Sequence, residues 1–189
     1  MSALSEAPDR SGRLLVLALG CTLRGDDGVG PAVLQELAAQ GPLLDGVDLV
    51  DGGTPGLETA LLLEGYQRAI IIDAAEMGRR PGEWARLEVD PEGSLQGRGV
   101  EDGALPQATT LHQAGLAEAL VLGATLRVLP EAVTIYGVQP LECGWSAGLS
   151  GPVKAAIGEV CRAIGDEIGS AEAAGQAKLR GNHGQDSRH

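Results

Sequence analysis

The sequence contains no phenylalanine, and aromatic residues make up only 2% of its 189 residues. Hydrophobic residues nevertheless reach 43%, so the core has to be built from Leu, Ile, Val and Ala. No apolar run is long enough to span a bilayer, and the N-terminus carries Asp and Glu where a signal peptide would be basic and then apolar. These absences predict a cytoplasmic globular protein without a membrane partner.

Cysteine and basic residues are also scarce. Cys21, Cys143 and Cys161 show no CxxC or other metal-ligand spacing, and a sparse, odd count fits free thiols in a reducing compartment. Lys and Arg number 14 against 26 Asp and Glu, which gives a formal net charge of −12. Such a charge repels phosphates and argues against nucleic acid, whereas it suits a cation or a basic partner. On composition alone, charge that only keeps the protein in solution is the simpler explanation.

Strand-like and helix-like segments alternate along the chain. The runs LLVLA and AIII are apolar throughout, as in strands that are covered on both faces. Alternation of this kind predicts an α/β three-layer sandwich, with a twisted, mostly parallel sheet of about five strands and helices on both faces. The expected strands are 13–18, 47–51, 68–73, 83–89 and 132–138, and the expected helices are 31–39, 57–63, 113–122 and 153–168.

The chain has the length of one domain, and its two ends differ in character from its body. Residues 1–12 and 169–189 are small or polar and show no apolar period, so both are predicted to be disordered. Residues 13–168 form the predicted single α/β domain. Ser150 is a plausible cap for its last helix, with Pro152 in the first turn.

A glycine-rich stretch, Gly20–Gly30, follows the first predicted strand. In parallel sheets, ligands bind in the crevice at the carboxyl ends of the strands. The spacing is wrong for the GxGxxG motif of dinucleotide-binding loops, and Asp26 and Asp27 stand where a pyrophosphate would lie. A nucleotide-binding module is therefore disfavoured, and a cation is favoured. For Asp26, a role as the cap of the following helix is at least as good an interpretation.

Two more polar residues are expected at the same crevice. Asp73 follows three isoleucines at the end of the third strand, where a charge without a partner is costly. A carboxylate that accepts backbone N–H bonds in the turn explains Asp73 equally well. His112 is the only histidine within 13–168, although a single histidine is more often structural. An imidazole and two carboxylates form a reasonable set for nickel or zinc, with positions open for other ligands.

Two neighbouring features allow more than one interpretation. Asp51-Gly52-Gly53-Thr54 closes the second strand, and its glycines could admit another chain's backbone or simply form a turn. Cys21 could be a soft ligand or a nucleophile. Because residues 13–168 contain no second histidine to activate it, a role as a small buried apolar residue is preferred.

Taken in order, these motifs resemble those of the hydrogenase maturation endopeptidases. That family removes a C-terminal extension from the large subunit of nickel-iron hydrogenases after nickel has been inserted. The likeness spans residues 13–168. It departs from the family at Cys21, where Asn is usual, and at Ala18, where glycine is common. The matching segments are Gly20–Gly30 with its Asp-Asp-Gly-x-Gly end, Asp51–Thr54, Asp73-Ala74 with Met77-Gly78 and Pro81-Gly82, Thr110-x-His112-Gln113, and Gly137–Pro140.

The resemblance implies a nickel-dependent, aspartyl-type endopeptidase that acts on a hydrogenase large-subunit precursor. It assigns Asp27, Asp73 and His112 as both the catalytic residues and the metal ligands. Nickel would arrive with the substrate, and another divalent metal could substitute for it. The metal or a carboxylate would activate water, and the enzyme is expected to be monomeric. The alternative is a non-proteolytic metal-sensing assembly factor that uses the same three residues to check for nickel.

Overall fold

The computed structural model describes residues 10, 12–41, 45–97 and 111–182, with only the backbone described at 96–97, 111–114 and 171–182. Within these residues a six-stranded sheet has the order β2-β1-β3-β6-β4-β5. β2, β1, β3 and β6 run parallel, whereas β4 is antiparallel to both β6 and β5. The strands are β1 (Leu14–Ala18), β2 (Val47–Asp51), β3 (Arg68–Ala74), β4 (Trp84–Val89), β5 (Leu95–Gly97) and β6 (Ala132–Val138).

All the predicted strands are present, which confirms the mostly parallel sheet. The additional strand, β5, has only 3 residues, too short for the alternation of apolar and polar side chains that marks a strand in a sequence. It pairs with β4 at the outer edge of the sheet. β5 therefore owes its conformation to its neighbour rather than to its own residues.

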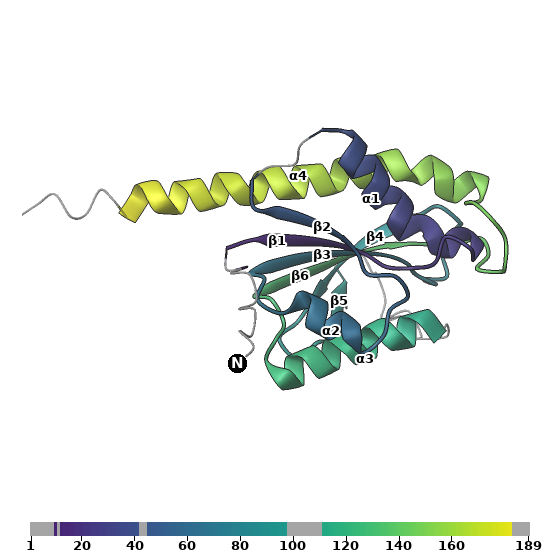
Figure 1. Ribbon diagram of the computed structural model, residues 1–189. Coiled ribbons are helices and arrows are strands. Elements are labelled where there is room, and N and C mark those ends of the chain that lie inside the picture. The colour runs from purple at the N-terminus through teal and green to yellow at the C-terminus, as the bar shows by residue number, and fades with distance from the viewer. Residues whose placement is uncertain (1–9, 11, 42–44, 98–110, 183–189) are drawn as a thin grey trace, which may run out of the picture.

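Helices cover both faces of the sheet, as predicted (Figure 1). α1 and α4 lie on one face, and α2 and α3 lie on the other. Successive strand residues point to opposite faces, so Val16 and Ile70 belong to the core beneath α1 and α4, whereas Leu17 and Ile71 belong to the core beneath α2 and α3. The helices are α1 (Val29–Ala39), α2 (Glu58–Leu63), α3 (Leu111–Leu126) and α4 (Gly151–Asn182).

The predicted apolar stripe of the last helix faces the sheet. Val153, Val160 and Ile164 are fully buried against it. A polar contact fixes the helix farther along, where the Glu167 carboxylate accepts hydrogen bonds from Arg86 Nε (2.7 Å) and Tyr136 Oη (2.9 Å). Burial favours a higher pKa for Glu167, but these bonds outweigh it and the pKa falls below its ordinary value. Apolar packing and one charge-assisted anchor together attach α4 to the sheet.

α4 does not end near Ile168 but continues to Asn182. The prediction of disorder after residue 168 is therefore wrong for residues 169–182. This stretch has four alanines and one each of Glu, Gln, Lys, Leu and Arg, which favour helix, against three glycines, and extending an existing helix requires no new nucleation. Residues 183–189 and most of the N-terminal segment predicted to be disordered lie outside the described residues. Among the helices that the structure describes, none combines the length and apolarity that crossing a membrane requires.

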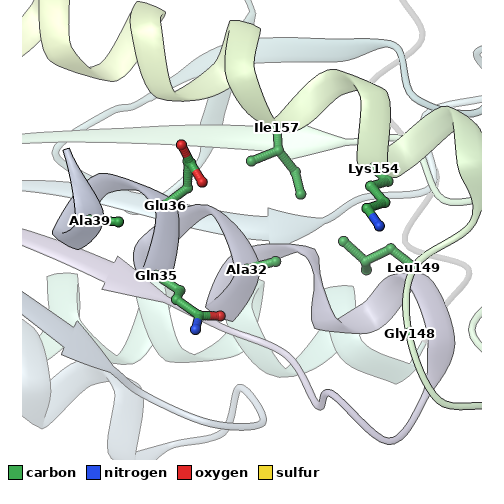
Figure 2. Close-up of a pocket in the computed structure, with 8 residues that line it drawn as sticks. All are labelled: Ala32, Gln35, Glu36, Ala39, Gly148, Leu149, Lys154 and Ile157. Carbon is green, nitrogen blue, oxygen red and sulfur yellow. The ribbon is translucent and has the colours of Figure 1, made fainter.

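A groove of about 460 Å³ runs between α1 and α4 (Figure 2). Ile157 and Lys154 of α4 face Ala32 and Glu36 of α1 across it. None of the residues predicted to form the site lines this groove. The groove lies between two helices on one face of the sheet, whereas the predicted site residues lie at the carboxyl ends of the strands.

Gly30, in the first turn of α1, lets that helix lie directly on the ends of two strands. A Cβ at this position would overlap the carbonyl oxygen of Leu19 and would lie 2.7 Å from the carbonyl oxygen of Ile72. Both obstacles are backbone atoms of the sheet and cannot rotate away. The Asp-Asp-Gly-x-Gly motif therefore ends in glycine because of close helix–strand packing.

We expect Gly30→Ala to lower the free energy of unfolding by about 3 kcal/mol or to prevent folding, because the methyl group has no space. Gly158→Ala is the matched control. Gly158 also lies within a helix, but it is exposed and has no atom within 4 Å of the added Cβ. That change should stabilise the protein by about 0.5–1 kcal/mol. Urea denaturation of both variants tests this, and equal stability of Gly30→Ala and the unmutated protein would contradict the close packing.

Candidate functional site

The loop that follows β1 is bonded both to β3 and to the loop that follows β2. The Leu19 N–H donates to Ile72 O at 2.8 Å, and the Gly20 N–H donates to Gly53 O at 2.8 Å. Gly20 has a φ of +119°, and a Cβ there would overlap the carbonyl oxygen of Asp27. Only glycine suits this position, where the chain turns back so that the Asp27 segment covers the end of β1.

Asp27 lies in the 3-10 turn Gly25–Gly28 and is 1% exposed. Its Oδ2 accepts a hydrogen bond of 2.8 Å from the backbone N–H of Cys21, so the loop fixes its own carboxylate. Cys21 itself is only half-buried, so the prediction of a small buried apolar residue is wrong. The donor is a backbone group, which Asn at this position would supply equally well. The departure from the family at Cys21 therefore leaves this contact intact.

Asp73 lies at the end of β3 with 3% of its surface exposed. Its Oδ1 accepts a 2.8 Å hydrogen bond from the Ala74 N–H. Burial raises the pKa of Asp73 to about 7, with the negative charge of Asp27 as the second cause, and the bond from Ala74 offsets only part of this. The structure thus brings Asp27 and Asp73, two of the predicted site residues, into one electrostatic environment.

Asp26 does not cap the following helix, and that interpretation is wrong. The cap position of α1 is Gly28, with no side-chain bond. The Asp26 carboxylate instead accepts hydrogen bonds from the backbone of Leu141 (2.8 Å), Glu142 (3.3 Å) and Ser150 (2.6 Å), and from the Ser150 hydroxyl (2.8 Å). Burial would raise its pKa, but the four bonds outweigh burial and lower the pKa of Asp26. Asp26 therefore ties the loop between β6 and α4 to the turn that carries Asp27.

That loop, residues 139–150, brings Cys143 to the site. Cys143 is half-buried, and burial raises the pKa of its thiol to about 11, with Asp27 and Asp26 as the next causes. Asp73 acts on it in the same direction. Little in the sequence indicated this position, since Cys143 shows no ligand spacing. Its place shortly after a strand end is the one signal that could have found it.

Gln139 positions the loop that follows Asp73. It is 3% exposed, and its Oε1 accepts hydrogen bonds from the backbone N–H groups of Met77 (2.7 Å) and Arg79 (3.1 Å). Its Nε2 donates to the Glu76 carboxylate at 2.7 Å. The amide thus uses both its acceptor and its donor to fix the backbone beyond β3. This explains why glutamine, rather than an apolar residue, stands in the Gly137–Pro140 motif.

His112 lies in the first turn of α3, and its side chain is outside the described residues. The start of α3 contacts the loop after β2, since a Cβ at Gly115 would lie 2.7 Å from the carbonyl oxygen of Pro55. The backbone of His112 is therefore near the same sheet edge as the carboxylates, and its role stays a prediction. Among the described residues, no group of three His, Cys, Asp or Glu side chains is placed to hold a metal.

The sequence also matches a family of known proteins. The family model described as hydrogenase maturation protease matches residues 31–167. The chain belongs to the hydrogenase maturation protease family. The matched stretch includes Asp73 and His112, and Asp27 lies just before it.

Relatives in this family are similar in both sequence and fold. The hydrogenase expression/formation protein HupD of Rhizobium leguminosarum bv. viciae is 31% identical over 151 residues, which cover 79% of this chain and 71% of HupD. The solved structure of the hydrogenase maturating endopeptidase HybD from E. coli has a TM-score of 0.67 at 27% identity, covering 80% of this chain and 89% of HybD. A hydrogenase 2 maturation peptidase from a Thaumarchaeota archaeon has a TM-score of 0.61 at 32% identity, covering 83% and 98%.

The raised pKa of Asp73 predicts a pH-dependent cost to stability in chelator-treated protein. A carboxylate with a folded pKa near 7 contributes most to stability below its unfolded pKa, and the contribution is lost as pH rises through about 7. Asp73→Asn removes this titration. The quantity to compare is the free energy of unfolding of Asp73→Asn minus that of the unmutated protein. This difference should be about 2 kcal/mol larger at pH 8 than at pH 5.

Urea denaturation at the two pH values measures this difference. In an Asp27→Asn background the difference should be smaller, because the like charge that helps to raise the pKa of Asp73 is gone. A difference that does not change with pH would show that Asp73 titrates as an ordinary carboxylate.

The Asp26 contacts predict the opposite behaviour. Asp26→Asn should lower the free energy of unfolding by about 2–3 kcal/mol at neutral pH, since an amide NH₂ would face backbone donors. Ser150→Ala, which removes one bond of the four, should cost about 1 kcal/mol. Because the pKa of Asp26 is lowered, its contribution is present above the unfolded pKa and is lost as pH falls through the folded pKa. Urea denaturation at neutral and acid pH tests this. A free energy of unfolding that Asp26→Asn leaves unchanged at pH 7 would show that the Asp26 hydrogen bonds do not stabilise the fold.

Proposed function

We propose that this chain is an endopeptidase that removes the C-terminal extension of a nickel-iron hydrogenase large-subunit precursor, and that nickel enters its site as part of that substrate. Family membership supports the peptidase activity, and HybD is named an endopeptidase. The observation that carries the proposal is the pair of buried carboxylates, Asp27 and Asp73, in which the charge of Asp27 helps to raise the pKa of Asp73.

The donor set suits a divalent cation. Two nearby carboxylates oppose each other's ionisation, so a positive charge between them would be strongly favoured. Carboxylate oxygens with an imidazole nitrogen form a borderline set that nickel accepts, and other divalent metals can occupy it as well. In this proposal Asp27, Asp73 and His112 bind the cation that the precursor carries. Such a cation supplies Lewis acidity, which polarises a carbonyl group and acidifies water.

The residues of the chain supply positioning and proton transfer. Asp27 is fixed by the Cys21 N–H, and Asp73 is fixed at the end of a central strand, so both present their charge in a set geometry. An aspartyl-type reaction follows, in which a site carboxylate accepts a proton from water as the water oxygen bonds to the scissile carbonyl carbon. The C–N bond then breaks, and the new amine takes up a proton. Fixed geometry of this kind lowers the entropic part of the barrier.

Substitution at each of the three positions should abolish processing. We expect Asp27→Asn, Asp73→Asn and His112→Ala each to reduce cleavage of nickel-loaded precursor by at least about 100-fold, because each removes a cation ligand. Asp166→Asn, an exposed carboxylate on α4, is the control and should cleave normally. Mass spectrometry of the precursor measures the reaction, and circular dichroism checks the fold of each variant.

Two outcomes would overturn this proposal in different ways. A precursor whose mass stays unchanged with the unmutated protein would favour the non-proteolytic assembly factor that checks for nickel. Normal cleavage by all three variants would show that the reaction takes place elsewhere on the chain.

A further inference from the structure

Three large apolar side chains are exposed to solvent on the two loops that adjoin the turn carrying Asp27. Leu23 is 62% exposed, Leu141 is 58% exposed and Trp145 is 84% exposed. Leu23 belongs to the loop that precedes Asp27, and the other two belong to the loop 139–150. A tryptophan with this exposure gains a large apolar contact area, typically about 150–250 Å², when a partner covers it. We call these three residues the rim patch.

The two loops of the rim patch are bonded to each other. Arg24 and Ser146 form a parallel β-bridge, and the Gly25 N–H donates to Ser146 O at 2.9 Å. The Asp26 N–H donates to Glu142 O at 3.1 Å, in addition to the bonds that the Asp26 carboxylate accepts. Figure 1 shows both loops at the edge of the sheet where α1 and α4 begin. The contacts use backbone and carboxylate groups, so the apolar side chains of the patch are left facing outward on a fixed frame.

The rim patch is continuous with the negative charge of the site. Cys143 lies between Leu141 and Trp145 in the chain. The carboxylates of Asp27, Asp26 and Asp73 all act on its thiol, and together with burial they outweigh the opposing charge of Arg24. A partner that covers the patch therefore meets apolar side chains and a negative field together. The complementary partner carries apolar residues next to a positive centre. A metal-loaded protein segment has this chemistry, whereas a nucleic acid or an acidic peptide does not.

We propose that the rim patch is the docking surface for the apolar segment of the precursor that flanks its scissile bond, with Trp145 as the main specificity-determining residue. The inference rests on the proposed function, because the precursor is the partner it names. Aromatic residues at the centre of an interface commonly carry much of the binding energy. Here Trp145 and Leu141 bind the polypeptide, while Asp27 and Asp73 act on the bond beside it. Because Asp26 fixes the loop, it serves as a positioning residue for both functions.

Steady-state cleavage separates docking from chemistry. Trp145→Ala and Leu141→Ala should raise KM at least about 10-fold with kcat changed less than about 3-fold, as expected when binding common to substrate and transition state is removed. Leu126→Ala is the matched control. Leu126 is 53% exposed but ends α3 shortly before β6 begins, at the opposite edge of the sheet, and its KM should stay at the unmutated value. A KM for Trp145→Ala equal to that of the control would overturn the proposal.

Tryptophan fluorescence reports on the surface without cleavage. The chain has 2 tryptophans, and Trp84 stacks on Tyr136 at 5.7 Å, so Trp84→Phe leaves Trp145 as the sole probe. In an Asp27→Asn, Trp84→Phe protein, adding the nickel-loaded large-subunit precursor of the same organism should shift the Trp145 emission to the blue. Emission that stays solvent-like at saturating precursor would overturn the proposal. A blue shift that depends on protein concentration without precursor would overturn it too, since a second copy of the chain would then cover the patch.

This measurement also separates the two proposals. Should the precursor bind with a blue shift but never be cleaved by the unmutated protein, the docking surface stands and the endopeptidase function fails. Should cleavage be lost in Asp27→Asn while Trp145→Ala cleaves with an unchanged KM, the peptidase function stands and the docking surface fails.

Discussion

The site depends on the hydrogen bonds that the carboxylate of Asp26 accepts. A buried charge is tolerated only when its oxygens are satisfied, and here four donors from the loop 139–150 satisfy them. Because Asp26 precedes Asp27 directly, the same contact fixes the turn that presents the Asp27 carboxylate. Loss of this tie would release both sides of the crevice, the loop that carries Trp145 and the turn that carries Asp27.

The pKa values of Asp26 and Asp73, two buried acids at the carboxyl ends of the strands, are shifted in opposite directions. Asp26 is bonded on both oxygens, and its pKa is lowered, so it remains ionised and serves the structure. Asp73 is as deeply buried but receives only the bond from the Ala74 N–H, so burial and the charge of Asp27 raise its pKa to about 7. The protein thus stabilises the charge of Asp26 by itself and leaves the charge of Asp73 poorly compensated. Perturbed carboxylates of the second kind are typical of functional sites, where a ligand supplies what the fold does not.

The rest of the fold keeps this edge rigid. Gly30 allows α1 to lie on the strand ends, and Gln139, directly after the neighbouring strand β6, fixes the backbone beyond Asp73. Glu167 anchors the far part of α4 to the sheet. Each of these positions requires one residue type: glycine for its missing side chain, glutamine for its amide and glutamate for its carboxylate. A site assembled on strand ends and supported in this way keeps its geometry while a large protein substrate binds.

The sequence alone determined the layers of the protein and two of its candidate site residues. Apolar periodicity marked five of the strands and the core-facing side of α4, and the rule that ligands bind at strand ends led to Asp27 and Asp73. The tertiary structure decided the role of Asp26, the proximity of Cys143 and the exposure of the rim patch. Leu141 and Ser150, which bind Asp26, are 115 and 124 residues away in the chain. Local sequence patterns show the spacing of apolar residues and the end of each strand or helix. Hydrogen bonds between residues this far apart in the chain form only when the folded sheet brings its strand ends together.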